Sequence, residues 1–155
     1  MEHLALSDAP AGSAAPAAPA VAPAATVLSI EDLIRTAPNT PAGRYLRSFW
    51  QPVYHSIDLK KGRPVPLRIM SQGFTLYRGE SGAAALVDER CPHRGTQLST
   101  GWVEGDELRC FYHGWKFAPS GQCIEQPAEP LGHASKVSIR SYPVREYLGF
   151  IFAFL

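Results

Sequence analysis

The sequence predicts an all-β fold, an antiparallel sandwich or barrel, on three observations. From residue 49 onward, short stretches rich in β-branched and aromatic residues alternate with Gly, Pro, Ser or Asp, which is the pattern of strands joined by turns. Cys91 with His93 and Cys110 with His113 each lie at the end of such a stretch, so we expect them on loops that project as a smaller unit. A length of 155 residues suits one domain with a real core.

We expect the first 26 residues to be a disordered tail in front of a domain at 27–155. Alanine and proline dominate the tail, and it shows no apolar period. A secretory signal needs a basic start and an unbroken apolar core, whereas prolines interrupt this segment at positions 10, 16, 19 and 23. The segment also lacks arginine, so it does not indicate a mitochondrial presequence.

Two short helices and nine strands follow in order. Ser29 can cap a helix from Ile30 to Arg35, and Thr40 can cap a second helix that begins at Pro41 and runs through Leu46. The β-rich stretches then predict short strands. They are Trp50 to Tyr54, Val65 to Met70, Phe74 to Tyr77, Ala84 to Asp88, Glu107 to Phe111, Trp115 to Phe117, Val137 to Ile139, Val144 to Glu146 and Phe150 to Leu155.

Charge and composition exclude several classes of partner. The formal net charge is +1 with both signs mixed along the chain, which offers no footprint for nucleic acid or an anionic membrane. The longest apolar run, Leu148 to Leu155, is far short of the ~20 residues of a membrane span. Of three cysteines, two belong to the Cys and His pairs and only Cys123 is left. Without an internal disulfide framework, a cytoplasmic location is expected.

The two Cys and His pairs carry the functional prediction. Cys91-Pro-His93 and Cys110-Phe-Tyr-His113 each supply one thiolate and one imidazole from a short segment. A Rieske [2Fe–2S] centre needs two thiolates on one iron and two imidazoles on the other, from two separate loops. Cys91, His93, Cys110 and His113 are therefore the predicted ligands of the iron–sulfur cluster.

The residues around these pairs resemble a known family. Segments 91–95 (Cys-Pro-His-Arg-Gly) and 110–115 (Cys-Phe-Tyr-His-Gly-Trp) are similar to the paired boxes of Rieske domains in ring-hydroxylating oxygenases. The resemblance extends upstream through Arg44 to Val53 and downstream through Ser120 to Pro127. It implies a Rieske-type all-β domain whose cluster-binding part spans about residues 84–130.

The resemblance also implies roles for residues close to the ligands. Gly95 and Gly114 would let backbone N–H groups approach the bridging sulfides. Trp115 would shield the cluster from water, and Tyr112 would be a packing aromatic or a hydrogen-bond donor near it. Respiratory Rieske proteins tie the two loops with a disulfide at positions that here are Thr96 and Tyr112, so the resemblance is to the low-potential oxygenase and ferredoxin class.

A structural zinc site is the competing metal prediction, since two cysteines and two histidines also form a tetrahedral zinc set. Zinc fingers usually pair cysteine with cysteine and histidine with histidine, whereas each segment here carries one of each. Buried structural cysteines with chance histidines are the remaining alternative. Any one of the four residues, taken singly, favours this structural alternative. The occurrence of all four in this order and spacing argues against it.

Nearby residues receive structural predictions. Arg94 and Lys116 flank the boxes and are expected in solvent, with docking of an electron donor as the alternative. Cys123 is expected to be half-buried in a strand. The loop at 126–130 matches in position the proline-containing loop that lies beside the cluster in Rieske domains.

Two functions remain open on the sequence. In the first, the chain is the N-terminal electron-transfer domain of an aromatic ring-hydroxylating (dioxygenase) or demethylating oxygenase, and this oxidoreductase component receives electrons from a reductase or ferredoxin. In the second, it is a free-standing Rieske ferredoxin, an electron carrier. The segment Arg44 to Val53 and the long lead-in favour the first, because carrier ferredoxins are typically shorter.

The oxygenase hypothesis implies further parts. O2 activation needs a mononuclear Fe(II) held by two histidines and a carboxylate, and that iron is expected only in a fuller-length protein. The trimer known for the family likewise requires the catalytic domain. Residues 148–155 end inside a strand signal where oxygenase relatives continue, which predicts a fragment of such a subunit.

Overall fold

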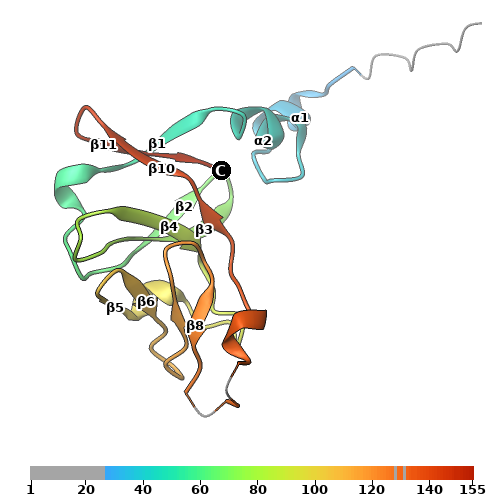
Figure 1. Ribbon diagram of the computed structural model, residues 1–155. Helices are drawn as coiled ribbons and strands as arrows, with labels where there is room; N and C mark the ends of the chain where they lie inside the picture. Colours follow the sequence, from blue (N-terminus) through green and yellow to red (C-terminus); the bar gives the residue numbers. More distant parts are fainter. Residues whose placement is uncertain (1–26, 128, 131) are drawn as a thin grey trace, which may run out of the picture.

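The computed structural model describes residues 27–127, 129–130 and 132–155 (Figure 1). The disorder expected for residues 1–26 therefore lies outside the described residues. The helices are α1 (Ile30–Ile34) and α2 (Pro41–Leu46), with 3₁₀ helices at Ser56–Asp58, Leu98–Thr100 and Ala134–Lys136. The strands are β1 (Trp50–His55), β2 (Val65–Ile69), β3 (Gln72–Arg78), β4 (Ala84–Asp88), β5 (Trp102–Glu104), β6 (Glu107–Arg109), β7 (Lys116–Phe117), β8 (Cys123–Glu125), β9 (Ser141–Tyr142), β10 (Val144–Tyr147) and β11 (Phe150–Phe154).

Both helices begin at the caps that the sequence predicts. The Asp32 N–H donates to the Ser29 hydroxyl at 3.2 Å, and the Asp32 carboxylate accepts from the Ser29 N–H at 2.9 Å, which together form a capping box. In α2 the Thr40 hydroxyl accepts from the Gly43 N–H at 3.1 Å, and Pro41 occupies the first turn. None of the helices in the described part of the chain has the length and apolarity that crossing a bilayer requires.

All strands pair antiparallel, in three sheets. Their orders are β1-β11-β10, β2-β3-β4-β9 and β5-β6-β7-β8. The three sheets follow one another from top to bottom of Figure 1, with both helices to one side. The prediction of an antiparallel all-β fold with short N-terminal helices is confirmed.

The central sheet separates two apolar cores. Along β3, Phe74 and Leu76 point into an upper core shared with β11, whereas Tyr77 points, with Val87 of β4, into a lower core shared with the β5–β8 sheet. Successive side chains of a strand point to opposite faces, so a strand covered on both faces is a continuous apolar run. The upper core contains Leu59, Phe74, Leu76, Leu86, Tyr142, Ile151, Ala153 and Leu155, and the lower core contains Tyr77, Ala85, Val87, Cys91, Leu98, Leu108, Cys110, Trp115, Phe117, Cys123 and Ile139.

The structure differs from the sequence prediction in its shortest strands. Strands β5 and β9 were not predicted, and of β8 only Cys123 was expected in a strand, because segments of two or three residues seldom show a period. The predicted strand Val137 to Ile139 is wrong: it follows a 3₁₀ helix and forms only an isolated bridge from Ser138 to Gln122. Its two apolar ends pack against the lower core without joining a sheet, so side-chain burial rather than strand pairing explains its composition.

Candidate metal centre

Two loops of equal length carry the four predicted ligands. The first loop, 91–96, lies between β4 and β5, and an isolated bridge joins Arg90 to Gln97 at its base. The second loop, 110–115, connects β6 with β7, and the pairing of these two strands closes its base. Each Cys and His pair therefore projects from an anchored turn at the end of a strand, as predicted.

The same hydrogen bonds turn both loops. In the first loop, the Cys91 N–H donates to the Thr96 carbonyl at 2.8 Å, and the Gly95 N–H donates to the Cys91 carbonyl at 2.9 Å. In the second loop, the Cys110 N–H donates to the carbonyl of the sixth loop residue at 2.8 Å, and the N–H of the fifth, again a glycine, donates back to Cys110 at 3.1 Å. The two loops are therefore built alike, although histidine is the third residue of one and the fourth of the other.

The glycines of these turns are required by the backbone. Gly95 has φ +70° and Gly114 has φ +72°, values that L side chains rarely adopt. A Cβ at Gly114 would also lie 3.2 Å from Cγ of Pro127 and 3.6 Å from Nη1 of Arg109, whereas no described atom lies within 4 Å of one at Gly95. Pro127 thus brings the loop at 126–130 against the second loop. The approach of backbone N–H groups to bridging sulfides, which these glycines would allow, stays a prediction.

The four predicted ligands come together sorted by type. Cys91 and Cys110 are each 2% exposed and lie in the lower core. Burial raises the pKa of the Cys91 thiol to about 11, opposed by a hydrogen bond with the His93 backbone and reinforced by Cys110 beside it. His93 and His113 face each other with their Nδ1 atoms 3.1 Å apart and their ring centroids 4.6 Å apart.

This arrangement fits a centre with two sulfur ligands on one iron and two nitrogen ligands on the other. Metal–nitrogen bonds of about 2.1 Å at a tetrahedral metal ion place its two nitrogens about 3.4 Å apart, close to the 3.1 Å between the two Nδ1 atoms here. A tetrahedral zinc ion needs all four donors around one point. The sorting of the donors favours the iron–sulfur hypothesis over zinc.

Two aromatic side chains of the second loop contact the histidine rings. Trp115 is buried and stacks on His93, with centroids 4.6 Å apart and planes 7° apart. Tyr112 is exposed and lies against His113 at a centroid distance of 3.8 Å. Each histidine ring is therefore in contact with one aromatic side chain of the second loop: His93 with the buried Trp115, and His113 with the exposed Tyr112. Shielding of a cluster by Trp115 stays a prediction.

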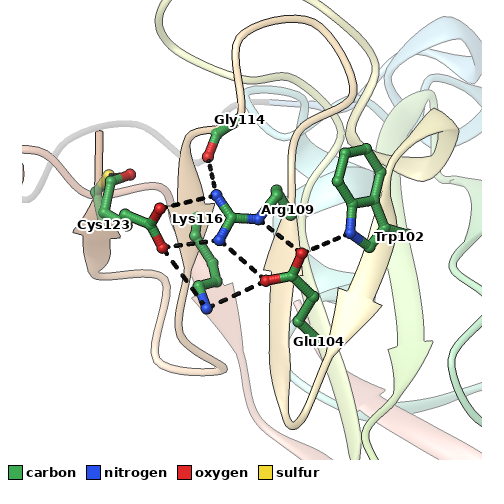
Figure 2. A network of polar contacts seen from close by, with 7 residues as sticks. Trp102, Glu104, Arg109, Gly114, Lys116 and Cys123 are labelled. Atoms are coloured by element: carbon green, nitrogen blue, oxygen red, sulfur yellow. Dashed lines mark hydrogen bonds and ion pairs between the residues drawn. The ribbon is translucent and has the colours of Figure 1, made fainter. Parts of the chain in front are cut away.

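A row of polar side chains crosses one face of the β5–β8 sheet beside these loops (Figure 2). Strand pairing places Trp102 of β5 opposite Arg109, and Lys116 of β7 opposite Arg109 on its other side. Glu125 of β8 stands opposite Lys116 in turn. Glu104, two residues beyond Trp102, shares their face. The register of four short strands therefore assembles one charged network, which we call the polar row.

Arg109 lies at the centre of the polar row (Figure 2). Its Nε and Nη2 donate to the two oxygens of Glu104 at 2.9 Å each, and its Nη1 and Nη2 donate to those of Glu125 at 3.1 and 2.7 Å. The other Nη1 hydrogen donates to the Gly114 carbonyl at 2.7 Å. All five N–H hydrogens of this guanidinium, whose side chain is 13% exposed, thus have acceptors.

These contacts shift the pKa values of the network. Hydrogen bonds from Arg109 first, and from the Trp102 indole second, lower the pKa of Glu104 to about 2. A hydrogen bond from Arg109 also lowers the pKa of Glu125. The two carboxylates, Glu125 first, raise the pKa of Arg109 above its ordinary value. All three groups are therefore charged at neutral pH.

The structure corrects two expectations for residues near the site. Lys116 was expected in solvent, and this is wrong: its side chain is 18% exposed, with Nζ 3.3 Å from Glu104 and 3.7 Å from Glu125. Arg94 is exposed, as expected. Cys123 lies in β8, and it is fully buried rather than half-buried, because it faces the lower core.

Sequence reasoning did not identify Arg109, Glu104 or Glu125. One local signal was available, since charged residues alternate with apolar ones on both sides of the second loop. That alternation predicts a charged face, but it does not say which charges meet.

Comparison with known proteins identifies the family. A family model described as Rieske [2Fe-2S] domain matches residues 49–143. Phenoxybenzoate dioxygenase subunit alpha from Ectopseudomonas oleovorans is 44% identical over 125 residues, which cover 79% of this chain and 30% of that protein. The 5,5'-dehydrodivanillate O-demethylase oxygenase subunit from Sphingobium sp. is 40% identical over 130 residues, which cover 81% and 31%. Among solved structures, Pseudomonas putida CBB5 NdmA matches with a TM-score of 0.64 at 28% identity, over 72% of this chain and 36% of that one.

The matched region contains both loops and the whole polar row. The chain spans about 30% of the length of the curated relatives named above. Because the family model matches more than half of the residues, the chain belongs to the Rieske [2Fe–2S] domain family, whose cofactor is an iron–sulfur cluster.

Proposed function

We propose that this chain transfers single electrons as the Rieske part of an aromatic ring-hydroxylating or demethylating oxygenase. Cys91 and Cys110 bind one iron of the cluster, and His93 and His113 bind the other. The sorting of the donors carries this assignment, with the thiols buried together and the two Nδ1 atoms 3.1 Å apart. The dioxygenase and demethylase oxygenase subunits among the relatives support the enzyme class.

The residues of the chain determine how a partner reaches the site. A bound cluster supplies a one-electron couple. The thiols lie in the lower core, while His113 and Tyr112 are exposed, so electrons enter and leave on the histidine side. Cys91 has to lose its proton to bind iron, and its raised pKa makes cluster uptake compete with protonation.

The remaining parts of the reaction lie outside this chain in our proposal. The substrate site and a mononuclear Fe(II) belong to the part of an oxygenase subunit that the chain does not span. A reductase or ferredoxin supplies the electrons, and the longer protein is a homotrimer. The matches to oxygenase subunits favour this function over a free-standing ferredoxin. A cytoplasmic location agrees with the lack of a disulfide among Cys91, Cys110 and Cys123, all of which the structure describes.

Metal and sulfide analysis of the full chain, expressed anaerobically with iron, tests the ligand assignment. We expect two irons and two acid-labile sulfides per chain, with a Rieske electron paramagnetic resonance spectrum on reduction. Cys91→Ser and Cys110→Ser should abolish assembly, and His93→Ala should abolish the spectrum. Cys123→Ser is the matched control, since Cys123 is an equally buried cysteine of the same core. Zinc without sulfide in the pure protein, or equal losses in Cys123→Ser and Cys91→Ser, would refute the assignment.

A further inference from the structure

Each loop of the metal centre is preceded by an arginine that reaches across the turn. Arg90 Nη1 donates to the Gly95 carbonyl at 2.9 Å, and Arg109 Nη1 donates to the Gly114 carbonyl at 2.7 Å. In both loops the arginine directly precedes the cysteine, and the acceptor is the fifth loop residue. The contact therefore recurs with the turn, in two loops whose other residues differ.

The two arginines differ in how firmly they are held. The side chain of Arg90 is 63% exposed and has an ion-pair distance of 3.6 Å to Glu89. Water competes for such a group, so its contact contributes little. Arg109 is shielded and is held from both sides by the carboxylates of Glu104 and Glu125. Its position is therefore fixed by the sheet, independently of the loop.

The fixed guanidinium restrains the second loop at one residue, Gly114. The Gly114 carbonyl accepts from Arg109, and the Gly114 N–H donates to the Cys110 carbonyl. The residue before Gly114 is His113, whose Nδ1 faces His93, and the residue after it is Trp115, which stacks on His93. Hydrogen bonds on both sides of Gly114 thus orient the neighbouring His113 and Trp115 side chains, which place the histidine pair.

We propose that Arg109 is a positioning residue of the metal centre: it holds the second loop in the conformation that presents Cys110 and His113, and its charge adjusts the reduction potential of the cluster. The inference rests on the proposed function.

The charge effect follows from the composition of the polar row. Arg109 and Lys116 balance Glu104 and Glu125. Loss of the guanidinium charge leaves one excess negative charge beside the second loop. Negative charge disfavours the reduced cluster, so the reduction potential should become more negative.

Three variants of the full, cluster-loaded chain separate positioning from general stability. Arg109→Gln removes the charge and most donors, whereas Arg109→Lys keeps the charge but cannot reach all three acceptors. Arg78→Gln is the matched control. Arg78 is 12% exposed, and its hydrogen bonds go to the carbonyls of Gly82, Leu59 and Ser56 and to Glu146, all far from the second loop in sequence.

The readouts are the rate of iron loss to a chelator, the reduction potential and the electron paramagnetic resonance g values. Arg109→Gln should lose iron roughly 10- to 100-fold faster than wild type, the range found for residues that orient metal ligands. Its potential should shift negative. Arg109→Lys should also lose iron faster, with a potential close to that of wild type. Arg78→Gln should lower the thermal midpoint and leave iron loss, potential and g values unchanged.

Three results would overturn the inference. Equal rates of iron loss and equal potentials in Arg109→Gln and Arg78→Gln would mean that Arg109 contributes general stability alone. If Arg109→Gln does not fold, the same comparison is made between Arg109→Lys and Arg78→Lys, with the same three measurements. A wild-type chain that takes up no iron and sulfide would refute the proposed function and the inference with it, whereas a loaded wild type with an unaffected Arg109→Gln would refute the inference alone.

Discussion

Gly95 and Gly114 share a backbone conformation but differ in what surrounds them. Their φ angles are +70° and +72°, in a region that costs an L side chain roughly 1–2 kcal/mol. Only Gly114 has close neighbours, Pro127 and Arg109. At the scale of single residues, substitutions at these two glycines therefore separate the free-energy cost of backbone strain from the cost of steric contact with neighbouring side chains.

We expect Gly95→Ala to lower the free energy of unfolding by about 1 kcal/mol, through backbone strain alone. Gly114→Ala should lower it by about 2–3 kcal/mol, because the Pro127 ring or the Arg109 guanidinium has to move as well. Urea unfolding of both variants, followed by tryptophan fluorescence, measures the two values. Equal losses would show that the contact with Pro127 does not matter.

Among the elements, the β5–β8 sheet best shows how strand alternation creates two different faces. Leu108 and Phe117 pair across β6 and β7 and lie in the lower core. Their neighbours Arg109 and Lys116 pair in the same register and lie in the polar row. The inner face stabilises the fold by burial, and the outer face responds to pH and salt.

The polar row should make the fold sensitive to acid. Glu104 has a folded-state pKa of about 2 against an ordinary value of 4.5, so its ion pair contributes stability that is present above pH 4.5 and lost as the pH falls toward 2. Thermal midpoints measured from pH 5 to pH 2 should fall more steeply in wild type than in Glu104→Gln. High salt should reduce the difference, since Glu104 is partly exposed. Parallel curves for the two proteins would contradict this expectation.

The two cores should differ in their effect on the metal centre. Leu76 in the upper core and Leu108 in the lower core are both fully buried, so each change to alanine should lower the free energy of unfolding by about 2–5 kcal/mol. Only Leu108→Ala should speed iron loss, because Leu108 shares its core with Cys91 and Cys110. Iron release to a chelator, measured well below the thermal midpoint, compares them. A similar acceleration in Leu76→Ala would show that the cores are not independent.

In the whole molecule, the central sheet lies between the two apolar cores. Its strand β4 leads into the first metal-centre loop, the β5–β8 sheet below it carries the second loop, and the β1-β11-β10 sheet covers its upper side (Figure 1). The predicted ligands Cys91 and Cys110 therefore pack in the lower core, apart from the upper one.

The chain alone should store one electron and oxygenate nothing. The proposed ligands account for one cluster, and the chain spans about 30% of the oxygenase subunits that it matches. We expect two irons per chain rather than three. After chemical reduction, O2 and a panel of aromatic acids should give no hydroxylated or demethylated product by chromatography. Stoichiometric product from a preparation free of other subunits would overturn this expectation.

The sequence by itself determined the Rieske-type pattern of two Cys and His loops and the all-β class. These depend on local properties: donor chemistry at Cys91, His93, Cys110 and His113, and β-rich stretches between turn residues. The tertiary structure alone decided the rest. It assembled the polar row around Arg109, left 137–139 outside the sheets and half-buried Lys116 in that ion-pair network. The physical reason is that strand register and burial are set by cooperative packing of segments far apart in the chain, which no local pattern encodes.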